Sequence, residues 1–280
     1  MKTVVYTSDK KTHFFQELLD IFKDLRSSTF LALQMAKRDI KAEYRQSVLG
    51  FFWAFAPILM NSFVWIFLNS SGAISVNASE SIPYIPFVII GTTLWSIFTD
   101  GISMPLTAVN SNKGILSKIN FPKEALILSG IYKMAFNLVL KLVLVVAVLI
   151  FYQINPGVNI VLFPLYLLAL TLFALAIGLI ITPLGLIYTD ISRIINTGVS
   201  LLMYITPVVY AAPSIGFFKT LFKINPLSYV FIDSRAVLFG LPLQYGFLII
   251  ILSLISITIL MIGLVIFRKS MPIIIEKISG

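Results

Sequence analysis

The chain has 280 residues, of which 58% are hydrophobic and only 12% are charged, and its mean hydropathy is +0.97. Because soluble proteins carry about 25% charged residues, this composition excludes an ordinary water-soluble protein and predicts an integral membrane protein. The chain has no cysteine, which excludes a disulfide scaffold and a thiolate metal site, and its single histidine, His13, leaves no His-based triad. In a membrane protein the net charge of +9 is expected from Lys and Arg in cytoplasmic loops rather than from binding of nucleic acid.

Two amphipathic helices are predicted before the first membrane span. Apolar residues recur at helical spacing from Phe14 to Leu25 and again from Phe30 to Tyr44, with charged residues between them. A helix of this kind directly before a span is expected to lie in the plane of the membrane interface. Residues 1–47 are therefore predicted to form a cytoplasmic tail and an amphipathic interface helix.

Six segments are apolar and long enough for a bilayer crossing, which needs ~20 mostly apolar residues per helix. The predicted spans are residues 48–68, 84–108, 132–152, 160–187, 195–212 and 246–267. They form one all-α transmembrane domain over residues 48–267, followed by a cytoplasmic tail at 268–280.

The distribution of Lys and Arg predicts the orientation of these spans. Residues 1–47 hold nine of them, and the loop 109–131 and the tail after 267 hold three each. The first two outside loops, 69–83 and 153–159, hold none, although the third outside segment holds three. This asymmetry predicts a chain with both termini in the cytoplasm.

The segment 206–245 is too apolar for an ordinary loop and is interrupted by four prolines. Its helix-capable pieces, near 214–223 and 227–239, are each too short to cross a bilayer. Such helices at membrane depth are usually re-entrant, and we expect that arrangement over about 213–240, between spans 5 and 6. A folded external hairpin with no special role is the alternative.

Two ionisable residues, Asp100 and Lys141, lie near the middle of the second and third predicted spans. A charge at that depth costs roughly 2.5–3.5 kcal/mol on insertion scales, so both side chains should face protein or water rather than lipid. They could pair with each other across neighbouring spans, or Asp100 could take part in proton coupling.

Aromatic residues are 13% of the chain and concentrate in the predicted spans. Lipid-facing packing and interfacial anchoring account for most of them. Some rings could instead line a conduit, because a flat ring can stack on the apolar C–H face of a sugar. The candidate lining residues are Phe51, Phe52, Trp53, Phe55, Trp65, Trp95, Tyr204 and Tyr210.

The cytoplasmic segment 110–125, NSNKGILSKINFPKEA, is a candidate docking loop for a soluble partner. It has a basic, Asn-rich start, and Pro122 would end a short helix there. An ordinary solvated loop whose lysines set the topology is the alternative. The chain contains no Walker-type glycine loop, so it cannot itself hold ATP in that way.

Several segments together resemble the permeases of ABC type-2 polysaccharide, O-antigen and teichoic acid exporters. The run KRDIKAEYRQSVLGFFWA at 37–54 resembles the entry to the first span of these proteins, although Glu43 replaces a residue that is often basic. The first coupling loop of the family is similar to the segment around Phe121-Pro122. In the second cytoplasmic loop Thr189 replaces the usual arginine before Asp190-Ile191, which weakens the case for an ion pair to the partner at that point. The closing region TPVVY at 206–210 and Asn225-Pro226-Leu227, with Arg235 and Gly240, also resembles the family pattern.

The resemblance implies a homodimeric channel in the bacterial plasma (inner) membrane, bound to two copies of a separate ABC nucleotide-binding subunit. This chain would be no enzyme and would have no catalytic or metal-binding residue. It would bind no cofactor, since ATP and Mg²⁺ would be held by the partner. The implied cargo is a lipid-linked glycan, such as O-antigen on undecaprenyl diphosphate, a capsule or a teichoic acid.

The resemblance also implies roles for particular residues of this chain, and the first-span aromatics would line the glycan path. The residues implied for the interface helix and the lipid diphosphate are Lys37, Arg38, Asp39, Lys41, Tyr44 and Arg45. Those implied for coupling to the ATPase are Lys113, Lys118, Asn120, Phe121, Pro122, Lys123 and Asp190. Those implied for an external gate are Pro207, Asn225, Pro226 and Arg235.

Two readings from other classes stay open. An ion-coupled secondary transporter would use Asp100 and Lys141, although no internal repeat or pair of broken spans is obvious. A membrane-embedded lipid-modifying enzyme that needs a metal would require clustered carboxylates, and the acidic residues of the apolar region are scattered.

Overall fold

The computed structural model describes residues 14–45, 47–74, 82–116, 118–119, 121–211 and 216–279, and the regular elements of this part are helical. The first five are α1 (Phe14–Ser27), α2 (Thr29–Arg45), the 3₁₀ helix η1 (Gly50–Ala54), α3 (Ala56–Ser70) and α4 (Tyr84–Ser111). The next four are α5 (Lys113–Leu116), α6 (Glu124–Phe151), η2 (Val158–Leu162) and α7 (Phe163–Ile187). The last four are α8 (Thr189–Ile205), α9 (Gly216–Ile224), α10 (Pro226–Leu238) and α11 (Gly246–Ser279).

Within the described residues, four helical stretches are long and apolar enough to cross a bilayer. They are Tyr84–Ser111, Glu124–Phe151, Val158–Ile187 and Gly246–Lys277. Helix α3 is apolar but has only 15 residues, which rise about 22 Å against a hydrocarbon core of ~30 Å. Helix α8 has 17 residues. The all-helical membrane fold is therefore confirmed, whereas the count of six spans stays a prediction.

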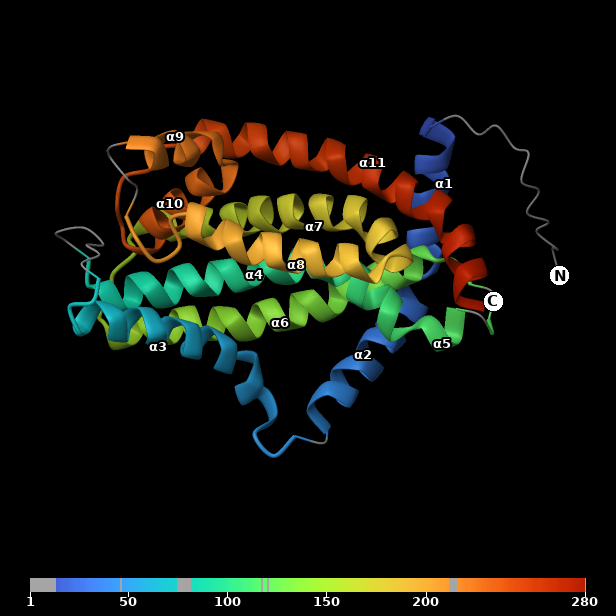
Figure 1. Cartoon of the computed structure of the whole chain (residues 1–280), viewed down its shortest axis with the longest axis horizontal. Helices are drawn as coiled ribbons and strands as arrows, with labels where there is room; N and C mark the ends of the chain where they lie inside the picture. Colours follow the sequence, from blue (N-terminus) through green and yellow to red (C-terminus); the bar gives the residue numbers. More distant parts are fainter. Residues whose placement is uncertain are drawn as a thin grey trace.

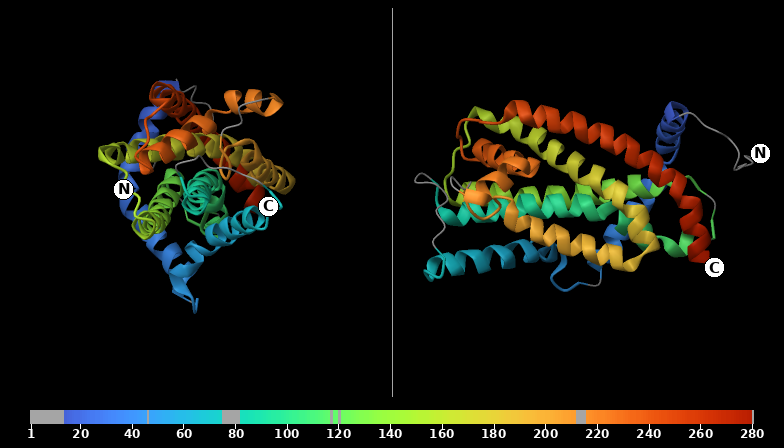
Figure 2. Two further views of the ribbon diagram at one scale, coloured as in Figure 1. Left: turned by 90° about the vertical axis from the view of Figure 1, so that its left-hand side faces the viewer. Right: turned by 45° about the horizontal axis from the view of Figure 1, so that its top comes forward.

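Helices α3, α4, α6, α7, α8 and α11 run along the long axis of the molecule (Figure 1). Helices α1, α2 and α5 and the end of α11 lie at one end, which we call the α1 end, and α9 and α10 lie at the other, the α10 end. Helix α4 is central, because it packs against α3, α6 and α7, and α11 covers α7 from the other side (Figure 2).

Small residues allow α4 and α7 to approach closely. A Cβ atom built on Gly178 of α7 would lie 2.5 Å from the carbonyl oxygen of Ile102, and one on Gly101 of α4 would lie 2.5 Å from the Cβ of Ala174. Contacts of this kind between small residues are typical of helices that associate in membranes, where lipid is as apolar as the side chains. Helix α4 is accordingly the most enclosed of the long helices.

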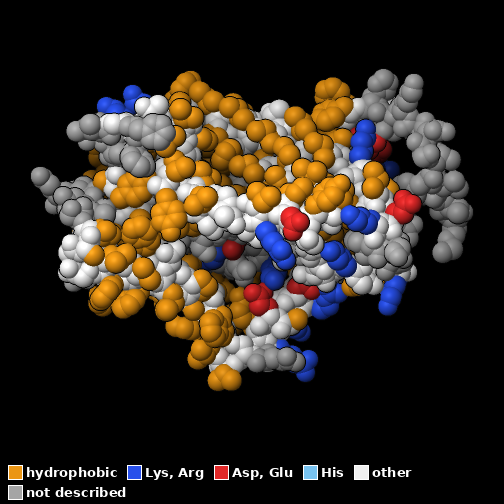
Figure 3. Space-filling view, in the orientation of Figure 1, with side chains coloured by type: hydrophobic (Ala, Val, Ile, Leu, Met, Phe, Trp, Pro, Cys, Tyr) orange, Lys and Arg blue, Asp and Glu red, His pale blue; other side chains and the backbone are white. Residues whose placement is uncertain are grey.

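Apolar side chains cover most of the length of the bundle on the face drawn in Figure 3, whereas charged side chains gather at the α1 end and in a hollow on the same face. Large apolar residues such as Val139, Ile150 and Leu254 are more than half exposed on α6 and α11. An exposed apolar band of this extent matches a lipid-facing surface.

The bounds of four helices differ most from the sequence prediction. Helix α3 begins at Ala56 rather than at residue 48, with Pro57 in its first turn, where a proline costs no hydrogen bond. Helix α8 occupies 189–205 instead of 195–212, because Pro207 disfavours helix at the preceding residue. The third predicted span begins eight residues early, at Glu124, and the sixth continues as helix beyond 267 to Ser279. The segments 188–194 and 268–279 are therefore largely helical rather than loop and tail.

The predicted amphipathic and broken segments are helical where expected. Helices α1 and α2 match the two amphipathic runs and are separated by Ser28. Helices α9 and α10 match the two short pieces before the last span. Pro213 and residues 1–13, including His13, lie outside the described residues.

Candidate functional site

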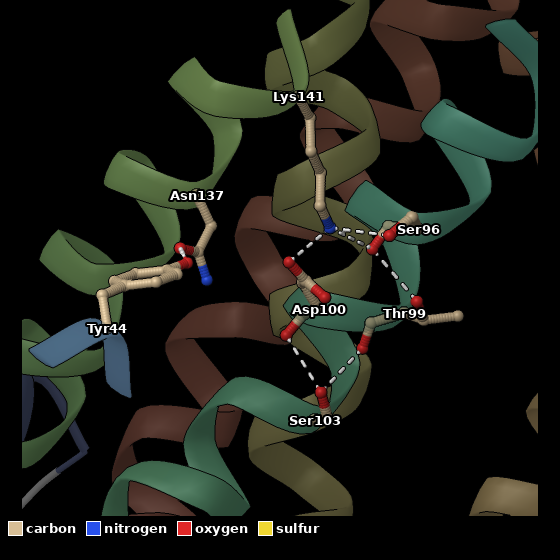
Figure 4. Close-up of polar contacts among 7 residues, drawn as sticks. All are labelled: Tyr44, Ser96, Thr99, Asp100, Ser103, Asn137 and Lys141. Carbon is tan, nitrogen blue, oxygen red and sulfur yellow. Dashed lines mark hydrogen bonds and ion pairs between the residues drawn. The ribbon is translucent and has the colours of Figure 1, made fainter. Parts of the chain in front are cut away.

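An ion pair in the bundle joins α4 to α6. The Nζ atom of Lys141 lies 2.6 Å from Oδ2 of Asp100 and donates to the hydroxyl and the carbonyl oxygen of Ser96, at 2.7 and 3.1 Å (Figure 4). Lys141 is 5% exposed, whereas the side chain of Asp100 keeps 36% exposure. The pairing that the sequence left open is therefore present. Lys141 is enclosed by protein, whereas Asp100 is partly exposed and lines two cavities.

The end of α2 contacts α6 beside this pair. The hydroxyl of Tyr44 donates to Oδ1 of Asn137 at 3.4 Å (Figure 4). The centre of the Tyr44 ring lies 4.7 Å from that of Phe51. Burial raises the pKa of the Tyr44 hydroxyl, and the neighbouring Glu43 raises it further. Glu43 itself forms an ion pair with Lys133 of α6, whose Nζ atom lies 2.8 Å from Oε2 of Glu43. The interface helix is thus attached to the bundle through polar contacts near the ion pair.

The aromatic residues predicted to line a path differ in their exposure. Phe51, Phe52 and Trp53 lie in η1, outside α3, and are 50–58% exposed, and Tyr204 of α8 is also exposed. Trp95 is only 6% exposed and packs against Phe98 and Phe231. Trp95 is therefore a core residue in this structure rather than an exposed ring.

The remaining predicted lining residues join neighbouring elements. Phe55 is partly buried directly before α3, and Trp65 of α3 packs against Tyr204 with ring centroids 6.2 Å apart. The hydroxyl of Tyr210 donates to the carbonyl oxygen of Tyr204 at 2.8 Å. Trp65, Tyr204 and Tyr210 form one cluster between α3 and the end of α8.

Helix α2 exposes most of its predicted cations. Lys37, Lys41 and Arg45 are exposed, as is Arg38. Arg38 pairs with Asp39 at 2.7 Å and donates to Oδ1 of Asn112, at the end of α4. The first three are available to an anion at the surface, whereas Arg38 also connects α2 to α4.

The predicted coupling loop lies between two cavities at the α1 end. Phe121 and Ile119 border both a cavity of about 290 Å³ against α2 and one of about 500 Å³ against the end of α11, which Pro122 and Lys123 also line. The Nζ atom of Lys123 lies 4.6 Å from the centre of the Phe121 ring. Burial lowers the pKa of the Lys123 ammonium, and Glu124 opposes that shift.

The other predicted coupling residues are dispersed. Lys113 is partly buried in α5, and Lys118 is exposed in the loop that follows. Asp190 lies in the first turn of α8 and pairs with Arg193 at 3.7 Å on a strongly exposed surface. Asn120 lies outside the described residues. The structure thus gathers Phe121, Pro122 and Lys123, while Asp190 belongs to a different helix.

A cluster that the sequence analysis missed surrounds Arg268. The Nη1 atom of Arg268 lies 2.9 Å from Asp24 and 3.0 Å from Glu124, and its Nε lies 3.5 Å from Glu17. This cluster joins α1, the start of α6 and the end of α11. A signal was present in the acidic residues of α1, but their partner lay in a segment predicted to be a free tail.

The predicted gate residues converge at the α10 end. The guanidinium of Arg235 is 4% exposed, donates to the carbonyl oxygens of Pro207 and Val208, and lies over the ring of Phe87. The side-chain amide of Asn225 donates to the hydroxyl of Thr206 at 2.9 Å.

Pro226 opens α10 at a position where its missing N–H is harmless, and the side chain of Asn225 caps that helix by accepting from the N–H of Leu227. Residues far apart in the chain thus fix the segment 206–210 against α10.

Two further residues complete this end of the bundle. A Cβ on Gly91 of α4 would lie 1.9 Å from the carbonyl oxygen of Val208, so only glycine fits there. The fully buried Asp233 accepts from the N–H groups of Gln244 and Tyr245, at 3.1 and 2.9 Å, and from the hydroxyl of Tyr166 at 3.3 Å. The hydrogen bonds of Asp233 therefore fix the two residues that precede α11.

Bilayer-length apolar helices that are joined by an ion pair between α4 and α6, with amphipathic helices at one end, define a multi-pass membrane protein. The model of the ABC-2 type transporter family matches residues 31–239, which is more than half of the chain. The chain belongs to that family and is a membrane transport subunit.

Three curated proteins similar to the chain carry the same name. The O-antigen export system permease protein RfbA of Myxococcus xanthus is 25% identical over 199 residues, which cover 71% of this chain and 75% of that protein. Two proteins of that name from Klebsiella pneumoniae are each 26% identical over 242 residues, which cover 85% of this chain and 91% of theirs. The similarity extends over most of both chains.

Proposed function

We propose that this chain is the channel-forming subunit of an ATP-driven exporter that moves a lipid-linked polysaccharide, O-antigen on undecaprenyl diphosphate, from the cytoplasm to the outer side of the bacterial plasma membrane. One observation carries the proposal: relatives that match 85% of the chain and 91% of their own length are named as O-antigen export permeases. Teichoic acid and capsule exporters of the same family are the alternative cargo classes. An ion-coupled secondary transporter that uses Asp100 and Lys141 is the alternative from another class.

The proposed topology has six crossings and both termini in the cytoplasm. It is supported by the contact of α1 with the end of α11, through Asp24 and Arg268, which places α1 and the C-terminal end of α11 at the same end of the bundle (Figure 1). In this topology η1 and α3 together make the first crossing and α8 makes the fifth. The α1 end is then cytoplasmic, and α9 and α10 are re-entrant helices at the outer surface.

The proposed assembly is a homodimer that binds two copies of a separate ABC ATPase, which holds ATP and Mg²⁺, so that this chain has no catalytic residue. Helix α2, the loop 110–125 and Asp190 are the proposed docking surface. The exposed position of Lys118 and the two cavities beside Phe121 support this role.

We also propose functions for the cations of α2 and for the α10 end. Lys37, Lys41 and Arg45 attract the lipid diphosphate, because basic side chains at the inner leaflet interact with anionic groups. The Arg235 cluster, with Pro207, Asn225 and Pro226, holds the external gate closed. The exposed aromatic residues of η1 and α8 line the glycan path.

Deletion of the chromosomal copy tests the function in the cell. The expected result is loss of polysaccharide from the surface together with accumulation of the lipid-linked glycan inside, both restored by the intact chain. The composition of the accumulated glycan distinguishes O-antigen from capsule and teichoic acid. Normal surface polysaccharide in the deletion strain would contradict the proposal.

A further inference from the structure

Two adjoining cavities lie between α2, η1, α4 and α6. The first, of about 250 Å³, is lined by Glu43, Tyr44, Trp53, Asp100, Asn137 and Lys141, among others. The second, of about 140 Å³, shares Asp100 and Asn137 with the first and adds side chains that include Asp39 and Lys133. We call the two together the inner groove. It lies beside the ion pair of Figure 4.

The charges of the inner groove already balance one another. Lys141 is paired with Asp100 at 2.6 Å, and Lys133 is paired with Glu43 at 2.8 Å. Asp39, the third carboxylate of the lining, is paired with Arg38 at 2.7 Å. A diphosphate would therefore find no unpaired cation among these lining residues. The cations that are exposed to an anion, Lys37, Lys41 and Arg45, lie on α2 outside the lining.

The groups that the inner groove does offer suit hydroxyls. The amide of Asn137 and the hydroxyl of Tyr44 can both donate and accept, and Asp100, with 36% of its side chain exposed, is a strong acceptor. The indole of Trp53 is 58% exposed at the same cavity. A ring with an open face beside clustered donors and acceptors matches a pyranose, which has polar edges and an apolar C–H face.

We propose that the inner groove is a saccharide-binding site, which takes an uncharged pyranose unit of the lipid-linked glycan. Trp53 stacks on the face of the sugar, and Asp100 and Asn137 bind its hydroxyl groups. The contact with Lys141 fixes the orientation of the Asp100 carboxylate, so Lys141 is a positioning residue. This inference rests on the proposed function and separates the recognition of sugar, in the groove, from that of phosphate, on the exposed face of α2.

Binding to the complex of this chain with its partner ATPase tests the inference. The complex is prepared in a sugar-free detergent, because a maltoside headgroup would compete, and is placed in nanodiscs of phosphatidylethanolamine and phosphatidylglycerol. One probe is farnesyl diphosphate linked to N-acetylglucosamine, and the other is farnesyl diphosphate alone. We expect Trp53→Ala and Asn137→Ala each to weaken binding of the sugar-bearing probe at least tenfold and to change binding of farnesyl diphosphate less than twofold.

Two further variants control for effects on folding. Trp53→Phe keeps a ring at the cavity and should restore affinity to within threefold of the wild type. Phe63→Ala removes a ring that is 63% exposed on α3 and does not line the groove, so it should change neither affinity more than twofold. Thermal unfolding of each variant confirms that the complex is intact.

Three results would overturn the inference. These are equal binding of the two probes by the wild type, parallel loss of both in the variants, and unchanged affinity of the sugar-bearing probe in Trp53→Ala and Asn137→Ala. A failure of the proposed function can be distinguished from a failure of this inference. If ATP-dependent export persists while the groove variants bind the sugar-bearing probe normally, only the groove inference is wrong, whereas lack of export by the wild-type complex refutes the exporter itself.

Discussion

The Nζ atom of Lys141 lies 2.6 Å from Oδ2 of Asp100 and thereby connects the centre of α6 to the centre of α4. Ser96 supplies two further acceptors to the same ammonium. In a bundle surrounded by lipid, this contact allows two charges to be accommodated at a depth where each alone would be costly. The pair is therefore a structural connection between the central helix and its neighbour.

Removing one partner of this pair should be more harmful than removing both. Lys141→Met leaves the Asp100 carboxylate without its partner. Because Asp100 is partly exposed, we expect the free energy of unfolding to fall by an amount between the ~1 kcal/mol of a surface pair and the ~3–5 kcal/mol of a fully buried pair. The double variant Asp100→Asn and Lys141→Met should recover most of this loss. Thermal unfolding of the permease in nanodiscs measures both effects.

Lys133→Met is the matched control for that experiment. Lys133 also pairs with a carboxylate on a neighbouring helix, but its side chain is 30% exposed and that of Glu43 is 43% exposed. Removal of the Lys133 ammonium should lower the free energy of unfolding by less than ~1 kcal/mol. Equal destabilisation by Lys133→Met and Lys141→Met would show that the Asp100–Lys141 pair contributes no more to stability than the more exposed Glu43–Lys133 pair.

Arg268 should hold α1 on the bundle. Arg268→Ala leaves Glu17, Asp24 and Glu124 close together without their shared cation. Because like charges repel and Glu124 is buried, we expect residues 14–27 to exchange amide hydrogens at least tenfold faster. Lys269→Ala removes an exposed cation from the adjacent position and should leave the exchange unchanged. Unaltered exchange in Arg268→Ala would show that apolar packing alone holds α1.

Gly91 should be intolerant of any side chain. Gly91→Ala places a Cβ 1.9 Å from the carbonyl oxygen of Val208, a distance that real structures do not show. The segment 206–210 must then move away from α4, and with it the acceptors of Arg235. We expect destabilisation of roughly 1–3 kcal/mol, as for other overpacked sites, and a leak of small solutes from vesicles.

Gly114→Ala is the matched control for Gly91→Ala. Gly114 also lies in a helix, but no atom lies within 4 Å of a Cβ built there. It should be neutral or slightly stabilising, since alanine favours helix over glycine by ~1 kcal/mol. A tight, fully stable Gly91→Ala variant would contradict the described packing of the segment against α4.

Phe121 should transmit ATP hydrolysis to export. Phe121→Ala removes the ring that separates the two cavities at the α1 end and that Lys123 covers. We expect ATPase activity to persist while export per ATP falls at least fivefold. Phe151→Ala removes an 80% exposed ring at the opposite end of α6 and should preserve coupling. A normal ratio of export to ATP hydrolysis in Phe121→Ala would contradict the coupling role and favour an ordinary solvated loop.

The sequence predicted the helical membrane fold because span length and amphipathic periodicity are local properties. The amphipathic runs and the short pieces that became α9 and α10 were identified on that basis. The boundaries near Ala56 and Thr206 were predicted less well, because they depend on where a proline is compatible with helix.

Long-range contacts of single residues were the least predictable part. Charge and position alone suggested that Asp100 and Lys141 could meet, since each needs a partner in lipid. Nothing in the sequence marked Gly91 as the neighbour of Val208, and the acidic residues of α1 did not identify Arg268 as their partner. Aromatic content likewise could not distinguish Trp95, in the core, from the exposed Trp53.

Transport by the reconstituted complex tests the central claim most directly, because this chain is proposed to be a passive channel whose energy comes from a separate ATPase. Sealed vesicles that contain the chain with its partner are supplied with lipid-linked polysaccharide and with either ATP or an imposed proton or sodium gradient. Appearance of polysaccharide on the far side only with ATP, and only when the partner is present, is the predicted result. Transport by this chain alone under an ion gradient, without nucleotide, would contradict the account.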